Sequence, residues 1–274
     1  MKTILVPTDY SDTANNALQY ALELAKFSHA KLILLHAYQI PLPTGEIPVM
    51  MISPQELEKD SSIRIKKLEK ELISKTSGNI KIESVVRAGF VPDEIMDTAK
   101  AKNADLIVMG VTGGSKIEEA LMGSSAISVI KHTQTPVLVI PKDARFKKIQ
   151  KIVLSYDYHD EMKETIMKKF KEFVQLFKAK VLVLNVVTPV EVPTYENAVA
   201  GSTIENSLKD IEHTLFFPSS DDITDEINAF ADAHQCDWLV MVPHKHKLLA
   251  GLFHKSNTKR MAFHTHIPLL ALHD

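Results

Sequence analysis

The chain has 274 residues, which is long for one compact domain and sufficient for two domains of about 140 residues each. Hydrophobic residues make up 45% of it and charged residues 24%, a balance that excludes a disordered or collagen-like protein. The net charge is −2, and the sequence has neither a run of like charges nor an apolar stretch long enough to span a bilayer. We therefore expect neither a nucleic acid nor a membrane as a partner. The single cysteine, Cys236, excludes an internal disulfide and favours a cytoplasmic, reducing setting.

The first half of the sequence alternates short apolar runs with amphipathic segments, which indicates strands alternating with helices. In chain order we expect a strand at 3–6, a helix capped by Ser11, a strand at 31–37, a helix at 54–75, a strand at 80–86, a helix at 92–101, a strand at 105–110, a helix at 124–131 and a strand at 136–140. Ser53-Pro54-Gln55-Glu56 has the form of a capping box with proline at the first helical position.

The second half repeats this order. We expect a strand at 151–155, a helix at 161–177, a strand at 180–187, a helix at about 196–212, a strand at 213–217, a helix at 222–234, a strand at 237–242, a helix at 256–264 and a strand at 268–272. The strands are rich in Val, Ile and Leu throughout, a pattern typical of parallel sheets that helices cover on both faces.

The two halves also resemble each other residue by residue. Residues 2–10, KTILVPTDY, parallel residues 150–158, QKIVLSYDY, and residues 104–109, ADLIVM, parallel residues 236–241, CDWLVM. A period of about 140 residues is the length of a domain and exceeds that of a solenoid repeat. The sequence therefore predicts a duplicated domain, with one unit at 1–146 and the other at 147–274.

Three segments of the first half are expected at the carboxyl ends of its strands, where open parallel sheets bind ligands. They are Pro7-Thr8-Asp9, Ala37, and the stretch from Gly110 through Gly113 to Gly123 and Ser124. Glycines let a backbone approach an anion closely, and a helix N-terminus offers free N–H groups, so the last stretch favours a phosphate cradle. The alternative is that Gly110 and Gly113 only make turns.

The spacing Gly110-x2-Gly113-x9-Gly123-Ser124, joined to Val6-Pro7-Thr8-Asp9, resembles the adenine-nucleotide motif of the universal stress protein family. The resemblance implies a tandem pair of flavodoxin-like (adenine nucleotide alpha hydrolase-like) α/β sandwiches, each with a five-stranded parallel sheet. It also implies ATP as ligand, with Mg²⁺ or Mn²⁺ between the phosphate oxygens. The residues it assigns to adenine, ribose and phosphates are Pro7, Thr8, Asp9, Ala37, Met109, Gly110, Gly113, Gly123, Ser124 and Ser125. It assigns neither a catalytic residue nor a metal-ligating side chain.

The second half departs from this motif. Val242, Lys245 and Lys255 stand where the first half has Gly110, Gly113 and Gly123, so we expect ATP in the first domain only. The pairs His244-x-His246 and His264-x-His266 have spacings that metal sites use, but no carboxylate or cysteine completes either pair at short spacing, so we expect them on surface loops. His132 is expected at a helix C-terminus. Cys236 is expected to be a small buried residue.

The expected function is regulatory: an adenine nucleotide occupies the first domain during a stress response, and an unidentified protein partner reads that state. Two alternatives stay open. One is a slow metal-dependent ATPase, although no Walker P-loop GxxxxGK[ST] occurs in the sequence. The other is a scaffold independent of nucleotide, whose second domain binds another ligand. The last strands of the two halves are apolar and are expected at sheet edges, which favours pairing there. Members of the family commonly dimerise through this strand, so the resemblance implies an intramolecular pseudo-dimer, joined antiparallel at these edges, and a homodimer is a further expectation.

Overall fold

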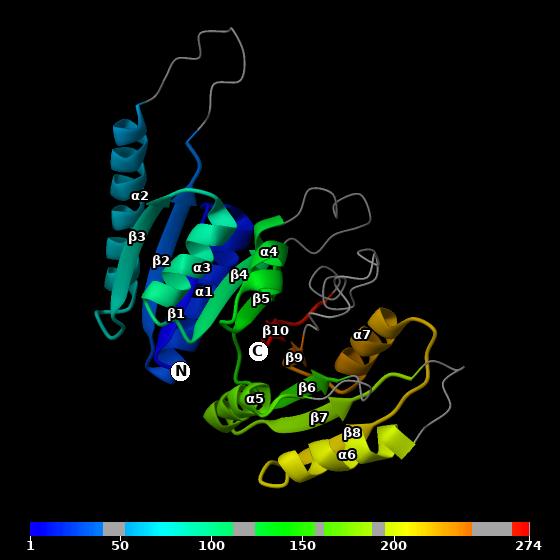
Figure 1. The fold of residues 1–274 in the computed structure, drawn as a ribbon. Helices are drawn as coiled ribbons and strands as arrows, with labels where there is room; N and C mark the ends of the chain where they lie inside the picture. Colours follow the sequence, from blue (N-terminus) through cyan, green and yellow to red (C-terminus); the bar gives the residue numbers. More distant parts are fainter. Residues whose placement is uncertain (41–52, 112–123, 157–161, 188–194, 243–264, 274) are drawn as a thin grey trace, which may run out of the picture.

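One continuous sheet runs through the molecule (Figure 1). The computed structural model describes residues 1–40, 53–111, 124–156, 162–187, 195–242 and 265–273. Within these residues, ten strands follow the order β3-β2-β1-β4-β5-β10-β9-β6-β7-β8. Each half of the chain contributes five parallel strands, and the two sets meet at β5 and β10. The predicted pair of five-stranded parallel sheets, joined as a pseudo-dimer, is confirmed.

The elements of the first half lie close to their predicted positions. They are β1 (Thr3–Pro7), α1 (Asp12–Ser28), β2 (Lys31–Tyr38), α2 (Pro54–Lys75), β3 (Ile82–Ala88), α3 (Val91–Ala101), β4 (Leu106–Val111), α4 (Ser124–His132) and β5 (Val137–Pro141). The predicted caps are present, since the Ser11 hydroxyl accepts a hydrogen bond from Ala14 N and Ser53 forms a capping box with Glu56.

The second half follows the same order. Its elements are β6 (Lys151–Ser155), α5 (Glu164–Phe177), β7 (Lys180–Leu184), α6 (Tyr195–Ser207), β8 (His213–Phe216), α7 (Ile223–Ala233), β9 (Trp238–Met241) and β10 (Leu269–Ala271). The predicted helix at 256–264 lies outside the described residues.

Two elements of the second half end several residues earlier than the apolar pattern predicts. The strand expected to reach residue 187 ends at Leu184, because beyond it only Val187 pairs, through an isolated bridge to Ser219. The helix expected to reach residue 212 ends at Ser207, because the chain turns there and Ile211 N donates to Leu208 O.

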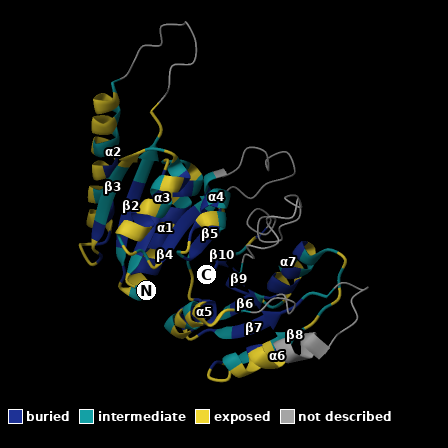
Figure 2. Ribbon diagram, viewed as in Figure 1, coloured by how far each residue is buried: buried dark blue, intermediate teal, exposed yellow. Residues whose placement is uncertain are grey.

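Side chains alternate between the two faces of the sheet, and each face packs into a core that runs through both halves. One core lies under α1, α2, α5 and α6; the other lies under α3, α4 and α7. Figure 2 shows the strands buried between helices whose outer faces are exposed.

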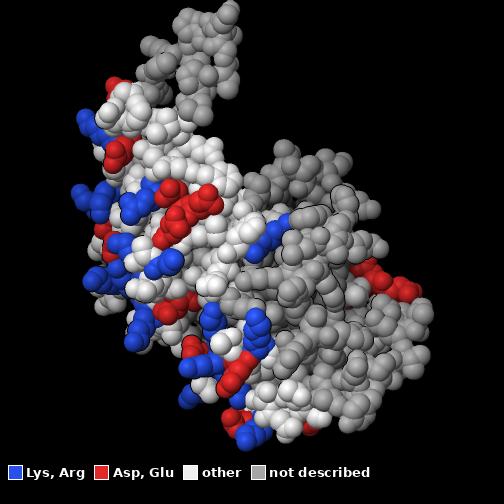
Figure 3. Space-filling view, viewed as in Figure 1, with Lys and Arg blue, Asp and Glu red and all other residues white. Residues whose placement is uncertain are grey.

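Among the described residues, no helix is long and apolar enough to cross a membrane. On the face shown in Figure 3, acidic and basic side chains are interspersed over the first half.

The strand seam between the halves is short and fully buried. Leu269, Leu270 and Ala271 of β10 pair antiparallel with Val139, Leu138 and Val137 of β5. Above one face of this seam, an aromatic cluster joins the halves: Tyr20 and Phe27 of α1, Phe146 of the linker, Phe173 and Phe177 of α5, and Trp238 of β9.

Candidate functional site

The strand order reverses between β1 and β4. From β1 the chain crosses outward to β2 and β3, and then returns to the other side of β1 with β4 and β5. Helices on opposite faces diverge at such a point, which leaves a crevice beyond the carboxyl ends of the two central strands. The residues predicted for nucleotide binding follow β1, β2 and β4 at this edge of the sheet.

A tightly bonded turn follows β1. Thr8 is buried, and its hydroxyl accepts a hydrogen bond of 3.0 Å from Tyr10 N, while Thr8 N donates to Leu35 O at 2.8 Å. Asp9 is exposed, and its Oδ1 accepts a bond of 2.9 Å from Ser11 N, the residue that caps α1. These bonds fix the Asp9 carboxylate at the sheet edge and turn the Thr8 hydroxyl toward its own backbone.

Three of the predicted residues share one face of the sheet. Met109 is buried in the core that also contains Leu5 and Leu35, and strand alternation places Pro7 and Ala37 on that same face. Helix α4 packs on this face and begins at Ser124, so its N-terminal amides lie at the edge where β4 ends.

Ser125, in the first turn of α4, is half-buried. Gly113 and Gly123 lie outside the described residues. The structure therefore brings Pro7, Ala37, Met109 and the start of α4 to one side of the switch point.

Gly110 has a packing role of its own. A Cβ built on Gly110 would lie 2.3 Å from the carbonyl oxygen of Thr13 and 3.2 Å from Ala14 N. Both atoms belong to the backbone of the first turn of α1, which cannot move aside as a flexible side chain would. Gly110 thus allows α1 to begin directly over the end of β4, on the opposite face from Met109.

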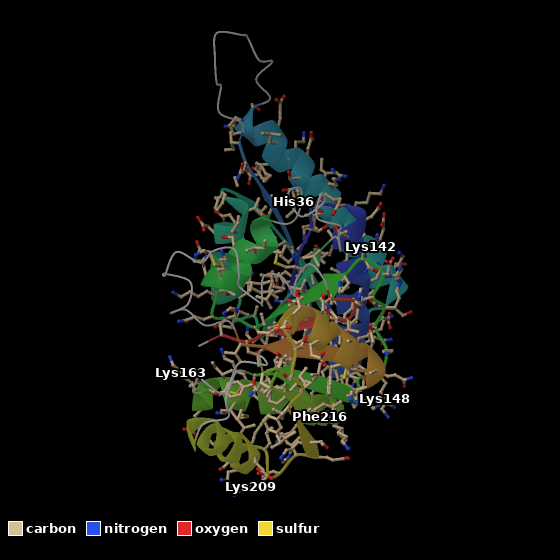
Figure 4. The ribbon with its side chains drawn as sticks, turned by 90° about the vertical axis from the view of Figure 1, so that its right-hand side faces the viewer. His36, Lys142, Lys148, Lys163, Lys209 and Phe216 are labelled. Carbon is tan, nitrogen blue, oxygen red and sulfur yellow. The ribbon has the colours of Figure 1, made fainter. Side chains whose placement is uncertain are left out.

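A cation–aromatic cluster lies on the α1/α2 face beside this edge, and the sequence analysis did not predict it. The Arg64 guanidinium stands 4.0 Å from the centroid of the Tyr10 ring, and the Tyr10 and His36 rings are 4.8 Å apart. His36 Nδ1 lies 2.8 Å from Thr8 O, and Figure 4 shows His36 beside α2. Burial raises the pKa of Tyr10, and the Arg64 charge opposes that rise. The sequence signal that could have indicated part of this cluster is the alternation along β2, which places His36 and Tyr38 on the same face of the sheet as Leu32 and Leu34.

The corresponding edge of the second half is more filled. Tyr156 N donates to Leu184 O just as Thr8 N donates to Leu35 O, so Tyr156 occupies the position of Thr8 and is buried there. Val186 and Val242 likewise stand where the first half has Ala37 and Gly110. The described part of α5 begins only at Glu164, whereas α1 begins five residues after β1.

Two predictions about single side chains are confirmed outside the site. Cys236 is buried, and burial raises the pKa of its thiol to about 11. His132 lies in the last turn of α4 with its Nδ1 2.9 Å from Ser128 O.

Comparison with known proteins agrees with this fold. Residues 1–141 match the family model described as the universal stress protein family, so the chain belongs to that family. A universal stress protein of Methanocaldococcus jannaschii is 33% identical over 146 residues, which are 52% of this chain and 82% of that protein. A universal stress protein of Synechocystis is 33% identical over 141 residues, 51% of this chain and 85% of that protein.

A solved structure extends the likeness to the whole two-domain arrangement. The crystal structure of a universal stress protein from Archaeoglobus fulgidus superposes with a TM-score of 0.77, covering 99% of this chain and 98% of that one. At 16% sequence identity this likeness concerns the fold alone. The sequence relatives cover about half of this chain each, in keeping with a tandem arrangement.

Proposed function

We propose that the protein binds one adenine nucleotide per chain, at the switch point of residues 1–146, and acts as a regulatory protein of the stress response. Pro7, Ala37 and Met109 would line the base and ribose, with Thr8 and Asp9 at the rim. Gly110 would line the ribose beside Met109, and Gly113 and Gly123, with Ser124 and Ser125 at the start of α4, would hold the phosphates. The helix start supplies N–H donors and a partial positive charge, which suit an anion.

The observation that carries this proposal is the contrast between the two halves. They share one fold, yet three described positions at the carboxyl edge carry a larger side chain in residues 147–274, namely Tyr156 for Thr8, Val186 for Ala37 and Val242 for Gly110, whereas Ser155 is smaller than its counterpart Pro7. The space that a nucleotide needs is therefore retained in the first half and reduced in the second. A structural scaffold with two equivalent roles would not require that asymmetry.

A divalent ion fits this proposal as a partner of the phosphates. The described residues contain no group of three His, Cys, Asp or Glu side chains that could hold a metal ion. Phosphate oxygens would therefore supply most of the ligands of Mg²⁺ or Mn²⁺, as Mg²⁺ commonly prefers. Bound to them, the ion would neutralise phosphate charge.

Titration calorimetry with ATP and Mg²⁺ tests the proposal. We expect one site per chain with a dissociation constant in the micromolar range, about −8 kcal/mol. Gly113→Lys introduces the residue that the second half carries and should abolish binding. Ala37→Val likewise introduces the residue that the second half carries, in this case on the face of the sheet. It should weaken ATP binding about tenfold, because the added methyl groups narrow the crevice.

Ala88→Val is the matched control, since Ala88 is exposed at the end of β3 beside the same edge. It should leave the affinity unchanged. Two equivalent sites per chain would contradict the confinement of nucleotide to residues 1–146. Absence of saturable binding to the unaltered protein would contradict nucleotide binding altogether and favour the scaffold alternative.

A further inference from the structure

The two halves are related closely enough for each residue to have a counterpart. Helices α1 and α5 both end on a residue in the left-handed conformation, His29 with φ 54° and Lys178 with φ 53°. The strand registers agree as well. Thr3 pairs with Lys31 in the first half as Lys151 pairs with Lys180 in the second. Likewise, Ile4 pairs with Leu106 as Ile152 pairs with Trp238. These matches make Lys169 and Leu176 of α5 the counterparts of Tyr20 and Phe27 of α1, and Asp105 the counterpart of Asp237.

The linker between the halves fills the space beside α1. The Phe146 ring packs edge-on against Tyr20, with centroids 5.3 Å apart, and lies 6.1 Å from the ring of Phe27. The next residue, Lys147, places its ammonium 2.8 Å from Oδ1 of the buried Asp237. An aromatic ring followed by a cation therefore occupies this position.

The related space beside α5 is a cavity of about 220 Å³. Its walls include Lys169, Glu172, Phe173 and Leu176 of α5, together with Ala104 and Asp105 before β4. Lys169 and Leu176 are the counterparts of the two residues that hold Phe146. Figure 1 shows the N-terminal end of the chain beside α5, and Met1 also lines this cavity.

We propose that this cavity is a binding site for an aromatic ring joined by a short chain to an ammonium group. The volume is adequate, because an apolar cavity of about 150 Å³ can hold benzene. Phe173 and Leu176 offer apolar walls of the kind that Tyr20 and Phe27 give to Phe146. Phe146 and Lys147 thus show, at the related position beside α1, the combination of an aromatic ring and an ammonium group that we propose for the ligand of this cavity.

The charges of the cavity fit a cation. The two aspartates bind the backbone in the same way: Asp105 Oδ2 accepts from Thr3 N at 2.9 Å, and Asp237 Oδ2 from Lys151 N at 2.9 Å. Asp237 also binds Lys147, whereas within the described part of the chain Asp105 forms no salt bridge. Glu172 adds a second carboxylate.

The one basic side chain among the lining residues, Lys169, already donates to the carbonyl oxygens of Gln134 at 3.0 Å and His273 at 3.4 Å. Its ammonium is held by neutral backbone acceptors, and the two carboxylates outnumber this one positive charge, so the lining side chains favour a cation.

The test uses 4-phenylbutylamine as probe, with binding to the full chain followed through the NMR shifts of the Thr135 and Leu176 amides. We expect saturable binding, at least fivefold weaker binding of the neutral 4-phenylbutanol, and no binding of hexylamine, which lacks the ring. N-acetyl-Phe-Lys-amide distinguishes the source of the ligand: tighter binding than the amine indicates a peptide segment, and weaker binding indicates a small aromatic amine.

Two variants locate the site. Ala104→Phe should fill the cavity and abolish binding, whereas Ala101→Phe, at an exposed position of α3, should not. Glu172→Gln should weaken the amine about threefold without affecting the alcohol, whereas Glu164→Gln, exposed in the first turn of the same helix, should leave both unchanged. Binding of the amine that is the same in Ala104→Phe and Ala101→Phe, or that does not saturate below about 10 mM, overturns the proposal.

Discussion

The indole Nε1 of Trp238 donates a hydrogen bond of 2.7 Å to the hydroxyl of Tyr20, although 218 positions of sequence separate the two residues. Trp238 lies on β9 and Tyr20 on α1, so the bond connects the two halves of the molecule. Both side chains are buried, and burial raises the pKa of Tyr20 well above its ordinary value. The hydroxyl therefore remains protonated and available as an acceptor throughout the pH range in which proteins fold.

Removal of this acceptor should destabilise the junction. In Tyr20→Phe, the buried N–H of Trp238 loses its partner, and we expect the free energy of unfolding to fall by about 1–3 kcal/mol in urea titrations. Tyr38→Phe, at a half-buried position near the end of β2, should change it by less than about 0.5 kcal/mol. The double variant Tyr20→Phe with Trp238→Phe removes donor and acceptor together, so its loss should be smaller than the sum of the two single losses. Equal losses for Tyr20→Phe and Tyr38→Phe would show that the bond contributes nothing to stability.

The strand seam should be equally sensitive to a buried charge. Val137 faces Ala271 across the β5–β10 pairing, and both are inaccessible to solvent. Val137→Lys or Leu269→Lys should therefore separate the halves and lower stability by about 3–5 kcal/mol, because no partner charge is available to the lysine. Ile63→Lys makes the same kind of change on α2, where the side chain is 59% exposed, and should be nearly neutral. Denaturant unfolding and small-angle scattering report the two effects; a compact, stable Leu269→Lys protein would contradict the role of the seam.

The sequence predicted the elements whose signals are local. Continuous apolar runs identified the strands, and the hydroxyls of Ser11 and Ser53 identified two helix starts, because a cap depends on residues only three positions apart. The apolar last strand of each half predicted pairing at an open edge, and the resemblance to the family implied that the pairing would be antiparallel. At the candidate site, the residues after β1, β2 and β4 were predicted from their place at the carboxyl ends of strands.

Features that depend on distant residues were not predictable in this way. The helix α6 ends at Ser207 although the sequence after it is compatible with a helix, because a turn bonded from Ile211 N to Leu208 O leads the chain into β8. The contact of Arg64 with Tyr10 joins α2 to the turn after β1, and no local pattern indicates it. Gly110 was predicted for its place near a ligand, whereas its close approach to Thr13 depends on how α1 crosses β4.

An ion cluster at the amino edge of the first sheet gives a pH-dependent prediction. Glu83 on β3 bonds to Lys102, after α3, and to Lys31 on β2, and these hydrogen bonds lower the pKa of its carboxyl group to about 2. The ionised carboxylate therefore stabilises the fold above the ordinary pKa of about 4.5, and this contribution is lost as the pH falls toward 2. Because Glu83 is 32% exposed, water screens the pair, and we expect Glu83→Gln to cost only about 1 kcal/mol at pH 7.

The contribution of the Glu83 charge can be measured by comparing Glu83→Gln with the same substitution at an exposed glutamate. The difference in unfolding free energy between Glu83→Gln and the unaltered protein should shrink steadily between pH 5 and pH 2. Glu71→Gln, at an exposed position of α2, should show little difference at any pH. If Glu83→Gln lowers the free energy of unfolding by the same amount down to pH 2, the effect arises from packing and not from the charge of the carboxylate.

Gly110 offers the most direct test of how the site is positioned. Gly110→Ala places a methyl group where only 2.3 Å separates it from the Thr13 carbonyl oxygen, so the first turn of α1 must move away from β4. We expect a loss of about 1–3 kcal/mol in unfolding free energy, as for other overpacked sites, and a weaker affinity for ATP because the β1–α1 turn that carries Asp9 shifts with the helix. Gly89→Ala is the matched control: the three atoms nearest to the added methyl group all belong to the flexible Glu94 side chain, which can rotate away at little cost. If Gly110→Ala were as stable as Gly89→Ala, the close approach of α1 to β4 would not be what requires a glycine at this position.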